Sequence, residues 1–333
     1  MWLWRRTAAI ALLIALNGWV DCVGQESSPS LLSRQDWVRF DLVLGRVRAN
    51  HLRAGQGRTV AGSEAEGDVR ESLLIGGEPT SRSIRYLRSD STSSCELRTA
   101  NNRQVTFTRS AAPGSTATGV RFTQRPGQPI LLEVADKNPT QTYRFASLWH
   151  LLLAEPNLGR QHVIPFLELL RPDWRLDAMR EQVQAALFDC AGSGQSPARQ
   201  DIDALITQLG SRDFAHRQAA DRELRNHGIA VLPYLQTSGN VLNGEQRLRV
   251  SRIRERLTVA TSDTPVRVAT WLANDKAIWL GLLAHDDAQK RKLAAARFSG
   301  IHAGPVLFDP LADEPHRRQQ IAALRSELAG TRR

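Results

Sequence analysis

Residues 201–257 read DIDALITQLGSRDFAHRQAADRELRNHGIAVLPYLQTSGNVLNGEQRLRVSRIRERL, and this stretch decides the fold of the C-terminal half of the chain. It divides into four short segments, each with apolar residues at helical spacing and a clear end. The segments are marked in turn by Leu205, Ile206 and Leu209, by Phe214, Ala220 and Leu224, by Val231, Leu232 and Leu235, and by Val250, Ile253 and Leu257. Helices this short cannot bury their apolar faces alone, so we expect them to stack on similar neighbours.

The same stretch resembles a HEAT-like helical repeat. The resemblance is carried by Leu209, Asp213, Arg217, Ala220, Leu224, Gly228, Leu232, Pro233 and Leu235. It is closest in kind to repeats of exported bacterial HEAT-repeat families that have no assigned activity. The resemblance implies an α-solenoid that binds another molecule, and it implies no reaction.

The Asp and Arg of this pattern have structural roles in such repeats. Asp213 stands where an N-cap would accept free backbone N–H groups, and Arg217 follows one turn later, at the spacing of an ion pair. Asp287 and Arg291 repeat the pattern 74 residues further on. We therefore expect a degenerate further copy over residues 264–330, and a truncated copy over residues 147–190.

A different period governs residues 71–146, where apolar and polar residues alternate between turn signals. This pattern predicts an antiparallel meander of about five or six strands with one buried face. Its polar face would carry Arg85, Thr106, Arg109, Arg121, Thr123 and Arg144. That face is either a binding surface for an anionic ligand or an ordinary solvated surface. Upstream, the spacing of apolar residues predicts a helix over residues 34–50, and Gly-rich residues 54–68 indicate a loop.

The N-terminus has the pattern of a signal peptide. Arg5 and Arg6 precede an apolar run over residues 7–16, which is too short to span a bilayer. Cleavage after residue 24 would export the mature chain to the periplasm, the envelope or the exterior; the alternative is an uncleaved anchor. The formal charge of +10 would fall to +9, since two arginines and one aspartate are lost. This excess favours an acidic protein or polymer as partner, and nucleic acid is not expected.

The predicted fold class is therefore α+β, a small antiparallel β domain followed by an all-α HEAT-like array. The expected segments are 1–24 (signal peptide), 25–146 (helix and β domain), 147–190 (first helical segment), 191–200 (linker), 201–257 (repeat) and 264–330 (degenerate repeat). The full chain of 333 residues has the composition of an ordinary globular protein, with 41% hydrophobic and 23% charged residues.

Catalytic and metal-binding motifs are missing from the sequence. No HExxH, GxSxG or CxxC pattern occurs, so we expect no metal, no cofactor and no enzyme activity. The best candidate binding site is the segment 245–257, whose arginines surround an apolar stripe. These candidate residues are Arg247, Arg249, Arg252, Arg254 and Arg256. Five guanidinium groups on one helix would create a positive potential for an anionic partner.

Two functions remain open at this stage. The first is an exported scaffold that binds a protein or an anionic polymer through its helical repeats. The second is a cell-envelope hydrolase with a site at the junction of sheet and helices. A deep pocket at that junction would favour the hydrolase, and a shallow basic groove would favour the scaffold.

Two cysteines remain once the signal peptide is removed. In an oxidising compartment, Cys95 and Cys190 could form a disulfide between the sheet and the helices. The alternative is two separate thiols.

Overall fold

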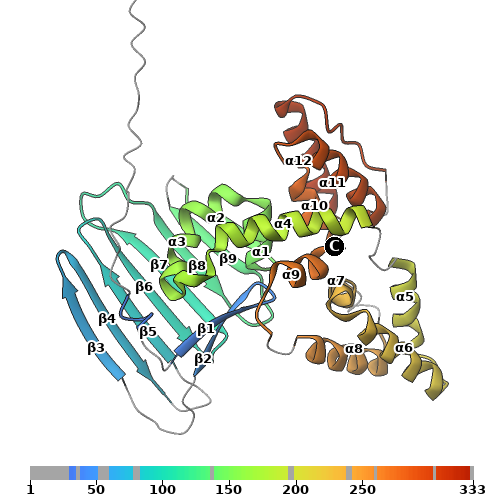
Figure 1. The fold of residues 1–333 in the computed structure, drawn as a ribbon, viewed down its shortest axis with the longest axis horizontal. Coiled ribbons are helices and arrows are strands. Elements are labelled where there is room, and N and C mark those ends of the chain that lie inside the picture. The colour runs from blue at the N-terminus through green and yellow to red at the C-terminus, as the bar shows by residue number, and fades with distance from the viewer. Residues whose placement is uncertain are drawn as a thin grey trace, which may run out of the picture.

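The computed structural model describes residues 30–34, 38–51, 60–77, 83–135, 139–193, 199–237, 242–258, 261–302 and 305–330. These residues form ten strands followed by twelve α-helices and two short 3-10 helices (Figure 1). The α+β class is thus confirmed. The predicted signal peptide, residues 1–24, lies outside the described residues. None of the described helices is long and apolar enough to cross a membrane.

Eight strands form one antiparallel sheet in the order β10-β9-β8-β7-β6-β5-β4-β3, so consecutive strands are neighbours throughout. The strands are β3 (Val60–Glu66), β4 (Val69–Gly76), β5 (Ser83–Ser89), β6 (Ser93–Ala100), β7 (Gln104–Ala111), β8 (Gly119–Gln124), β9 (Ile130–Ala135) and β10 (Gln141–Phe145). The meander is as predicted, but the sheet is large rather than small.

The prediction missed three strands because their sequences do not alternate cleanly between apolar and polar residues. Strand β3 falls within the predicted loop 54–68 and consists largely of small and acidic residues. Strand β4 places Glu71 on its buried face, and β6 places Thr99 there. Alternation of apolar and polar residues cannot be recognised in a sequence when polar residues occupy the inward positions of a strand.

The predicted helix over residues 34–50 is wrong. This segment forms a separate hairpin of β1 (Val38–Val43) and β2 (Arg46–His51). Leu44 and Gly45 make the turn with φ angles of 49° and 62°. Two successive left-handed residues fit the tight hairpin turns that match the twist of the strands. Helical and alternating spacing both fit the apolar residues here, and the turn decides between them.

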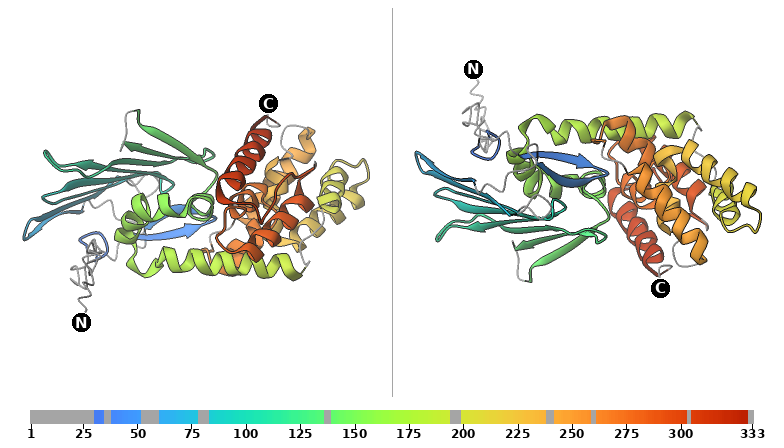
Figure 2. Two further views of the ribbon diagram at one scale, coloured as in Figure 1. Left: turned by 90° about the horizontal axis from the view of Figure 1, so that it is seen from above. Right: turned by 90° about the horizontal axis from the view of Figure 1, so that it is seen from below.

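One face of the large sheet is covered by the hairpin and by helices α1 (Leu148–Ala154), α2 (Pro156–His162) and α3 (Ile164–Leu170) (Figure 2). Its buried side chains include Ile84, Tyr86, Leu97, Val105, Phe107, Phe122 and Leu132. The rings of Phe107 and Phe166 are stacked at the centre of this layer. The other face of the sheet has no described element upon it.

Most of the helices belong to the same hydrophobic core as the sheet. They are α1–α3, α4 (Leu176–Ser193), α9 (Pro265–Leu272), α10 (Lys276–Leu282), α11 (Ala288–Ile301) and α12 (Glu314–Gly330). The core therefore runs across the predicted domain boundary at residue 146. Helix α9 packs against α4, although more than 70 residues separate them along the chain.

Residues between α4 and α9 form a lobe with a core of its own. The lobe comprises α5 (Arg199–Gln208), α6 (Phe214–Asn226), α7 (Leu232–Thr237) and α8 (Gly244–Leu257), and projects from the body (Figure 1). Ile206, Leu224 and Ile253 are among its buried residues. The four predicted helices of residues 201–257 are confirmed. A HEAT-like arrangement of these helices is not confirmed and stays a prediction.

Of the two alternatives for Cys95 and Cys190, the structure shows two separate thiols rather than a disulfide. Cys95 lies on β6, and Cys190 lies near the C-terminal end of α4, on the far side of the molecule from β6 (Figure 1). Burial raises the pKa of both thiols above the ordinary value. A disulfide requires two Cα atoms within about 7 Å, which these elements do not provide.

Candidate functional site

The predicted pair Asp213 and Arg217 has a structural role, but the two side chains do not pair with each other. Asp213 is the N-cap of α6, and its carboxylate accepts a hydrogen bond from the Ala215 backbone N–H at 2.8 Å. Arg217 Nη1 instead donates to the carbonyl oxygens of Ser211 and Arg212 at 2.8 and 2.9 Å. The aspartate satisfies the helix start, and the arginine ties down the preceding loop.

The second predicted pair has the same geometry. Asp287 caps α11 by accepting from the backbone N–H groups of Gln289 and Lys290. Arg291 Nη1 donates to the carbonyl oxygens of His285 and Asp286 at 2.8 and 2.6 Å. Its Nε donates to the Pro310 carbonyl at 2.7 Å, so Arg291 also holds the segment before α12. In both pairs the arginine is thus bonded to the loop before its own helix.

A third copy of this device was not recognised in the sequence. Asp313 accepts from the His316 backbone N–H at 3.0 Å, and Arg317 donates to the Ala312 carbonyl. The signal was present as Asp-x-x-x-Arg at the start of α12. The same spacing therefore stands at the starts of α6, α11 and α12, although Asp221 and Arg225 also show it within α6.

The arginine-rich segment is helix α8, and its start is well defined. Asn243 is the N-cap and forms a capping box with Gln246. The Gln246 side chain also donates to the Ile206 carbonyl at 3.0 Å, which fixes the start of α8 against the end of α5. Val250 and Ile253 are buried and set the inward direction of the helix.

The five arginines of α8 do not form one cluster. A helix turns by about 100° per residue, so Arg247 and Arg254 lie on one side of the buried stripe. Arg249, Arg252 and Arg256 lie on the other side. These five residues, from here on the α8 arginines, therefore form two rows.

The two rows are separated on the outer surface by an apolar side chain. Leu248 faces away from the core and is 48% exposed. Glu245 pairs with Arg249 Nε at 2.7 Å and neutralises that end of its row. Arg247, Arg252, Arg254 and Arg256 are exposed, and none of the ion pairs found among the described residues involves them.

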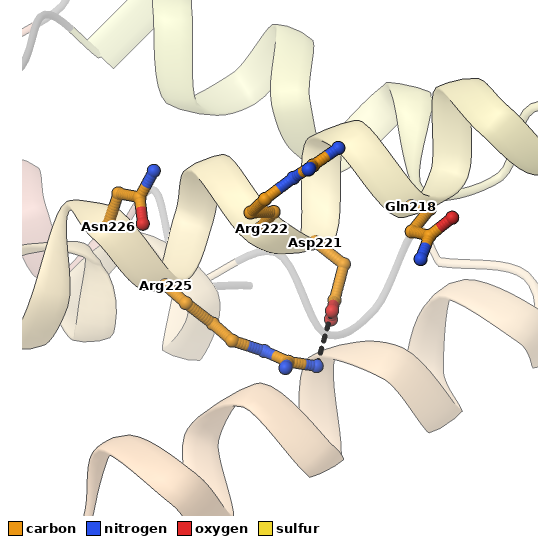
Figure 3. A pocket seen from close by; sticks show the side chains of 5 residues that line it. All are labelled: Gln218, Asp221, Arg222, Arg225 and Asn226. Carbon is orange, nitrogen blue, oxygen red and sulfur yellow. Dashed lines mark ion pairs between the residues drawn. The ribbon is translucent and has the colours of Figure 1, made fainter.

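Helix α6 adds basic residues next to this surface. Arg217 Nε lies 3.9 Å from Glu245 Oε1, which brings the first turns of α6 and α8 together. Further along α6, Arg225 pairs with Asp221, and the side chains around them border a shallow depression of 280 Å³ (Figure 3). Arg222 points away from this pair. The surface is therefore basic, polar and open.

Such a surface can bind anions. Arginine presents a planar fork of donors that matches carboxylate and phosphate groups, and it keeps its charge at any physiological pH. Three or more metal-ligating side chains do not come together anywhere in the described part of the chain.

A serine, a histidine and an aspartate meet at the junction of sheet and helices, where the sequence indicated no motif. Ser147 Oγ and His150 Nδ1 lie 2.8 Å apart, and His150 Nε2 lies 3.0 Å from Asp275 Oδ2. Ser147 follows β10, and Asp275 is 125 residues beyond His150 along the chain. Only the fold brings them together.

The surroundings of this triad favour a structural role. Ser147 is 1% exposed, and Gly45 lies so close that a Cβ there would stand 2.8 Å from the Ser147 hydroxyl oxygen. Ser147 and Asp275 are the N-caps of α1 and α10. Burial raises the pKa of Asp275, but His150 and two backbone N–H groups lower it by more. The pKa of Asp275 is therefore below its ordinary value. His150 thus joins two helix starts.

A buried aspartate anchors the hairpin beside this triad. Asp263 Oδ1 accepts from the Leu44 N–H at 2.6 Å, and Oδ2 accepts from the Gly45 N–H and Trp149 Nε1, both at 2.7 Å. Burial raises the pKa of Asp263, and these hydrogen bonds offset only part of that effect. No motif in the sequence indicates that Asp263 contacts a turn more than 200 residues away.

No family model, no curated protein and no solved structure matches this chain. Its function must therefore be inferred from its own residues.

Proposed function

We propose that this chain is an exported scaffold that binds an acidic protein through the α8 arginines and the adjoining surface of α6. One observation carries the proposal: four exposed arginines, which form no ion pair with any residue that the structure describes, surround an exposed leucine on a lobe that has its own core. Arginine and apolar side chains together are typical of protein interfaces, where a charged rim surrounds a desolvated centre.

The charge of the lobe supports the same proposal. Residues 199–258 contain ten arginines against seven acidic residues. The acidic residues are concentrated on α5 and α6, whereas α8 has five arginines against Glu245 and Glu255. The positive potential is therefore strongest at α8, and the resemblance to HEAT-like repeats is consistent with a partner held on a helical surface.

The test is a comparison of two charge-reversal variants of the mature chain. Arg252→Glu combined with Arg256→Glu should abolish capture of acidic proteins from an envelope extract, while the free energy of unfolding stays within about 0.5 kcal/mol. The matched control is Arg125→Glu combined with Arg318→Glu, which makes the same charge change away from the lobe. Proteins captured by both wild type and control, but lost with the α8 variant, are the partners.

Salt provides a second measurement on the same complex. Exposed charges are screened over about 8 Å at physiological ionic strength, so capture should weaken steadily as salt is added. Capture that persists in high salt and in the α8 variant would contradict the proposal.

The hydrolase is the alternative, and the triad of Ser147, His150 and Asp275 is the observation in its favour. We prefer the scaffold because a nucleophile must reach its substrate, and the Ser147 hydroxyl is covered by Gly45. Ser147→Ala distinguishes the two functions. Ester hydrolysis by the wild type that disappears in this variant would support the hydrolase; a loss of stability alone would support the structural role.

A further inference from the structure

The uncovered face of the eight-stranded sheet is a second basic surface, distant from α8 (Figures 1 and 2). Strand pairing places its outward side chains in rows that run across the strands. From β4 to β10 the first row is Leu74, Arg85, Arg98, Thr106, Thr123, Leu131 and Arg144. The second row is Ser72, Leu87, Glu96, Thr108, Arg121, Glu133 and Thr142.

Register corrects one residue of the predicted polar face. Arg109 lies on the covered side, opposite Val120, and its guanidinium is 3.3 Å from His162 Nδ1 on α2. The other five predicted residues do lie on the open face. Arg98, and Arg70 on β4, join them there.

Positive charge dominates this face. Its arginines are Arg70, Arg85, Arg98, Arg121 and Arg144, against the acidic residues Glu96 and Glu133. Arg98 and Arg121 are each 61% exposed at the side chain. A charge of this sign spread over a broad surface attracts polyanions.

Two of these arginines, Arg85 and Arg98, are held in place by a glutamate that lies between them. Arg85 and Arg98 stand directly opposite each other across β5 and β6. Glu96 lies between them, at 2.7 Å from Arg85 Nε and 2.9 Å from Arg98 Nε. These arginines hold the pKa of Glu96 below its ordinary value, so the bridging charge persists. Next to them Glu96, Arg98, Thr106, Thr108 and Arg121 line a depression of 220 Å³.

The spacing of the arginines fits a polymer that crosses the strands. Arg98, Arg121 and Arg144 lie on β6, β8 and β10 and alternate between the two rows. With strands about 4.8 Å apart and a rise of about 3.4 Å per residue, successive Cα atoms of this zigzag are about 12 Å apart. A chain laid across the sheet would therefore meet a guanidinium at every second strand.

The remaining side chains of the two rows select the class of polymer. Both rows contain hydroxyl groups and leucines but no Phe, Tyr or Trp. Aromatic side chains are what proteins commonly use to stack the bases of nucleic acids. Hydroxyl and guanidinium groups instead form hydrogen bonds with hydroxyl and carboxylate groups. We propose that this open face binds an acidic polysaccharide, a chain of sugars that bear carboxylates.

Binding of polygalacturonate to the full mature chain tests this proposal, with neutral dextran as the reference polymer. Arg98→Glu combined with Arg121→Glu should weaken polygalacturonate binding by about tenfold or more at low salt. Arg252→Glu combined with Arg256→Glu on α8 makes the same charge change and should leave this binding unaltered. Because both sheet arginines are largely exposed, the variant should stay folded, and Arg98→Gln combined with Arg121→Gln should give an intermediate loss.

Three outcomes would overturn the proposal. The first is equal binding of polygalacturonate by wild type and the sheet variant. The second is an equal loss in the α8 variant, which would assign the binding to net charge. The third is binding of polyaspartate, or of vesicles of anionic lipid, that is as tight as polygalacturonate and as sensitive to the sheet variant. The proposed function at α8 is independent of all three, since its own variant lies on the lobe.

Discussion

Replacing Asp263 by Asn should destabilise the protein strongly, because this carboxylate holds the β1–β2 turn, α1 and the segment before α9 together. Its two oxygens accept three hydrogen bonds, from Leu44 N–H, Gly45 N–H and Trp149 Nε1. An amide has one oxygen, so its NH₂ group must face at least one of these donors. A buried donor without a partner costs about 1–3 kcal/mol, and the lost bonds to a charged group cost about 1.5–3 kcal/mol each.

We therefore expect Asp263→Asn to lower the free energy of unfolding by about 2–5 kcal/mol. Chemical denaturation of the mature chain measures this difference, provided that the denaturant slope is unchanged. Asp286→Asn is the matched control, because Asp286 is exposed and its side chain has no hydrogen bond among those found. A loss below about 0.5 kcal/mol for Asp263→Asn would refute the anchoring role.

The pH dependence of the same variant checks the sign of the electrostatic argument. Burial raises the pKa of Asp263 in the folded state above its ordinary value of 3.8. Between the two pKa values the folded state binds more protons than the unfolded state, so the stability from this group rises as the pH falls. Wild type should therefore gain stability relative to Asp263→Asn between neutral pH and about pH 4. A relative loss over that range would mean that the hydrogen bonds outweigh burial.

Three further predictions concern the packing. Gly45→Ala should lower the melting temperature more than Gly67→Ala, as measured by thermal unfolding. The φ angle is near 60° at both glycines, but only at Gly45 would the new Cβ lie within 3 Å of other atoms. Arg291→Met should destabilise more than Arg217→Met in the same assay, since Arg291 makes three carbonyl contacts and Arg217 two; equal losses would contradict this order. Leu224→Ala should lower the free energy of unfolding by about 2–5 kcal/mol in chemical denaturation, because Leu224 is fully buried in the core of the lobe.

The helices of residues 201–257 were predictable because each carries its own signals. The apolar spacing is local to each helix, and the caps Asp213 and Asn243 act within one turn of the starts of α6 and α8. The role of Arg217 was predicted less well. The spacing in the sequence suggests Asp213 as the partner of Arg217, but the carbonyl groups of the preceding loop are also within reach. Only the tertiary structure shows that Arg217 donates to those carbonyl groups.

The hairpin at the N-terminal end of the fold shows the limit of periodicity. Its apolar residues fit a helix and a strand pair about equally, and the difference depends on two left-handed residues at the turn. That turn is stabilised by Asp263, which is distant in sequence. Local propensity was therefore overridden by a tertiary hydrogen bond.

The candidate sites divide in the same way. The sequence alone determined that the chain is α+β, that five arginines share one helix, α8, and that alternation places basic residues on one face of a sheet. Only the tertiary structure decided which of these charges lie together, because register sets the face and helix rotation sets the row. In the tertiary structure the α8 arginines form two rows, and Arg109 lies on the covered side of the sheet, whereas the other predicted basic residues of the sheet lie on its open face. The neighbours of a side chain depend on contacts between segments that are distant in the sequence.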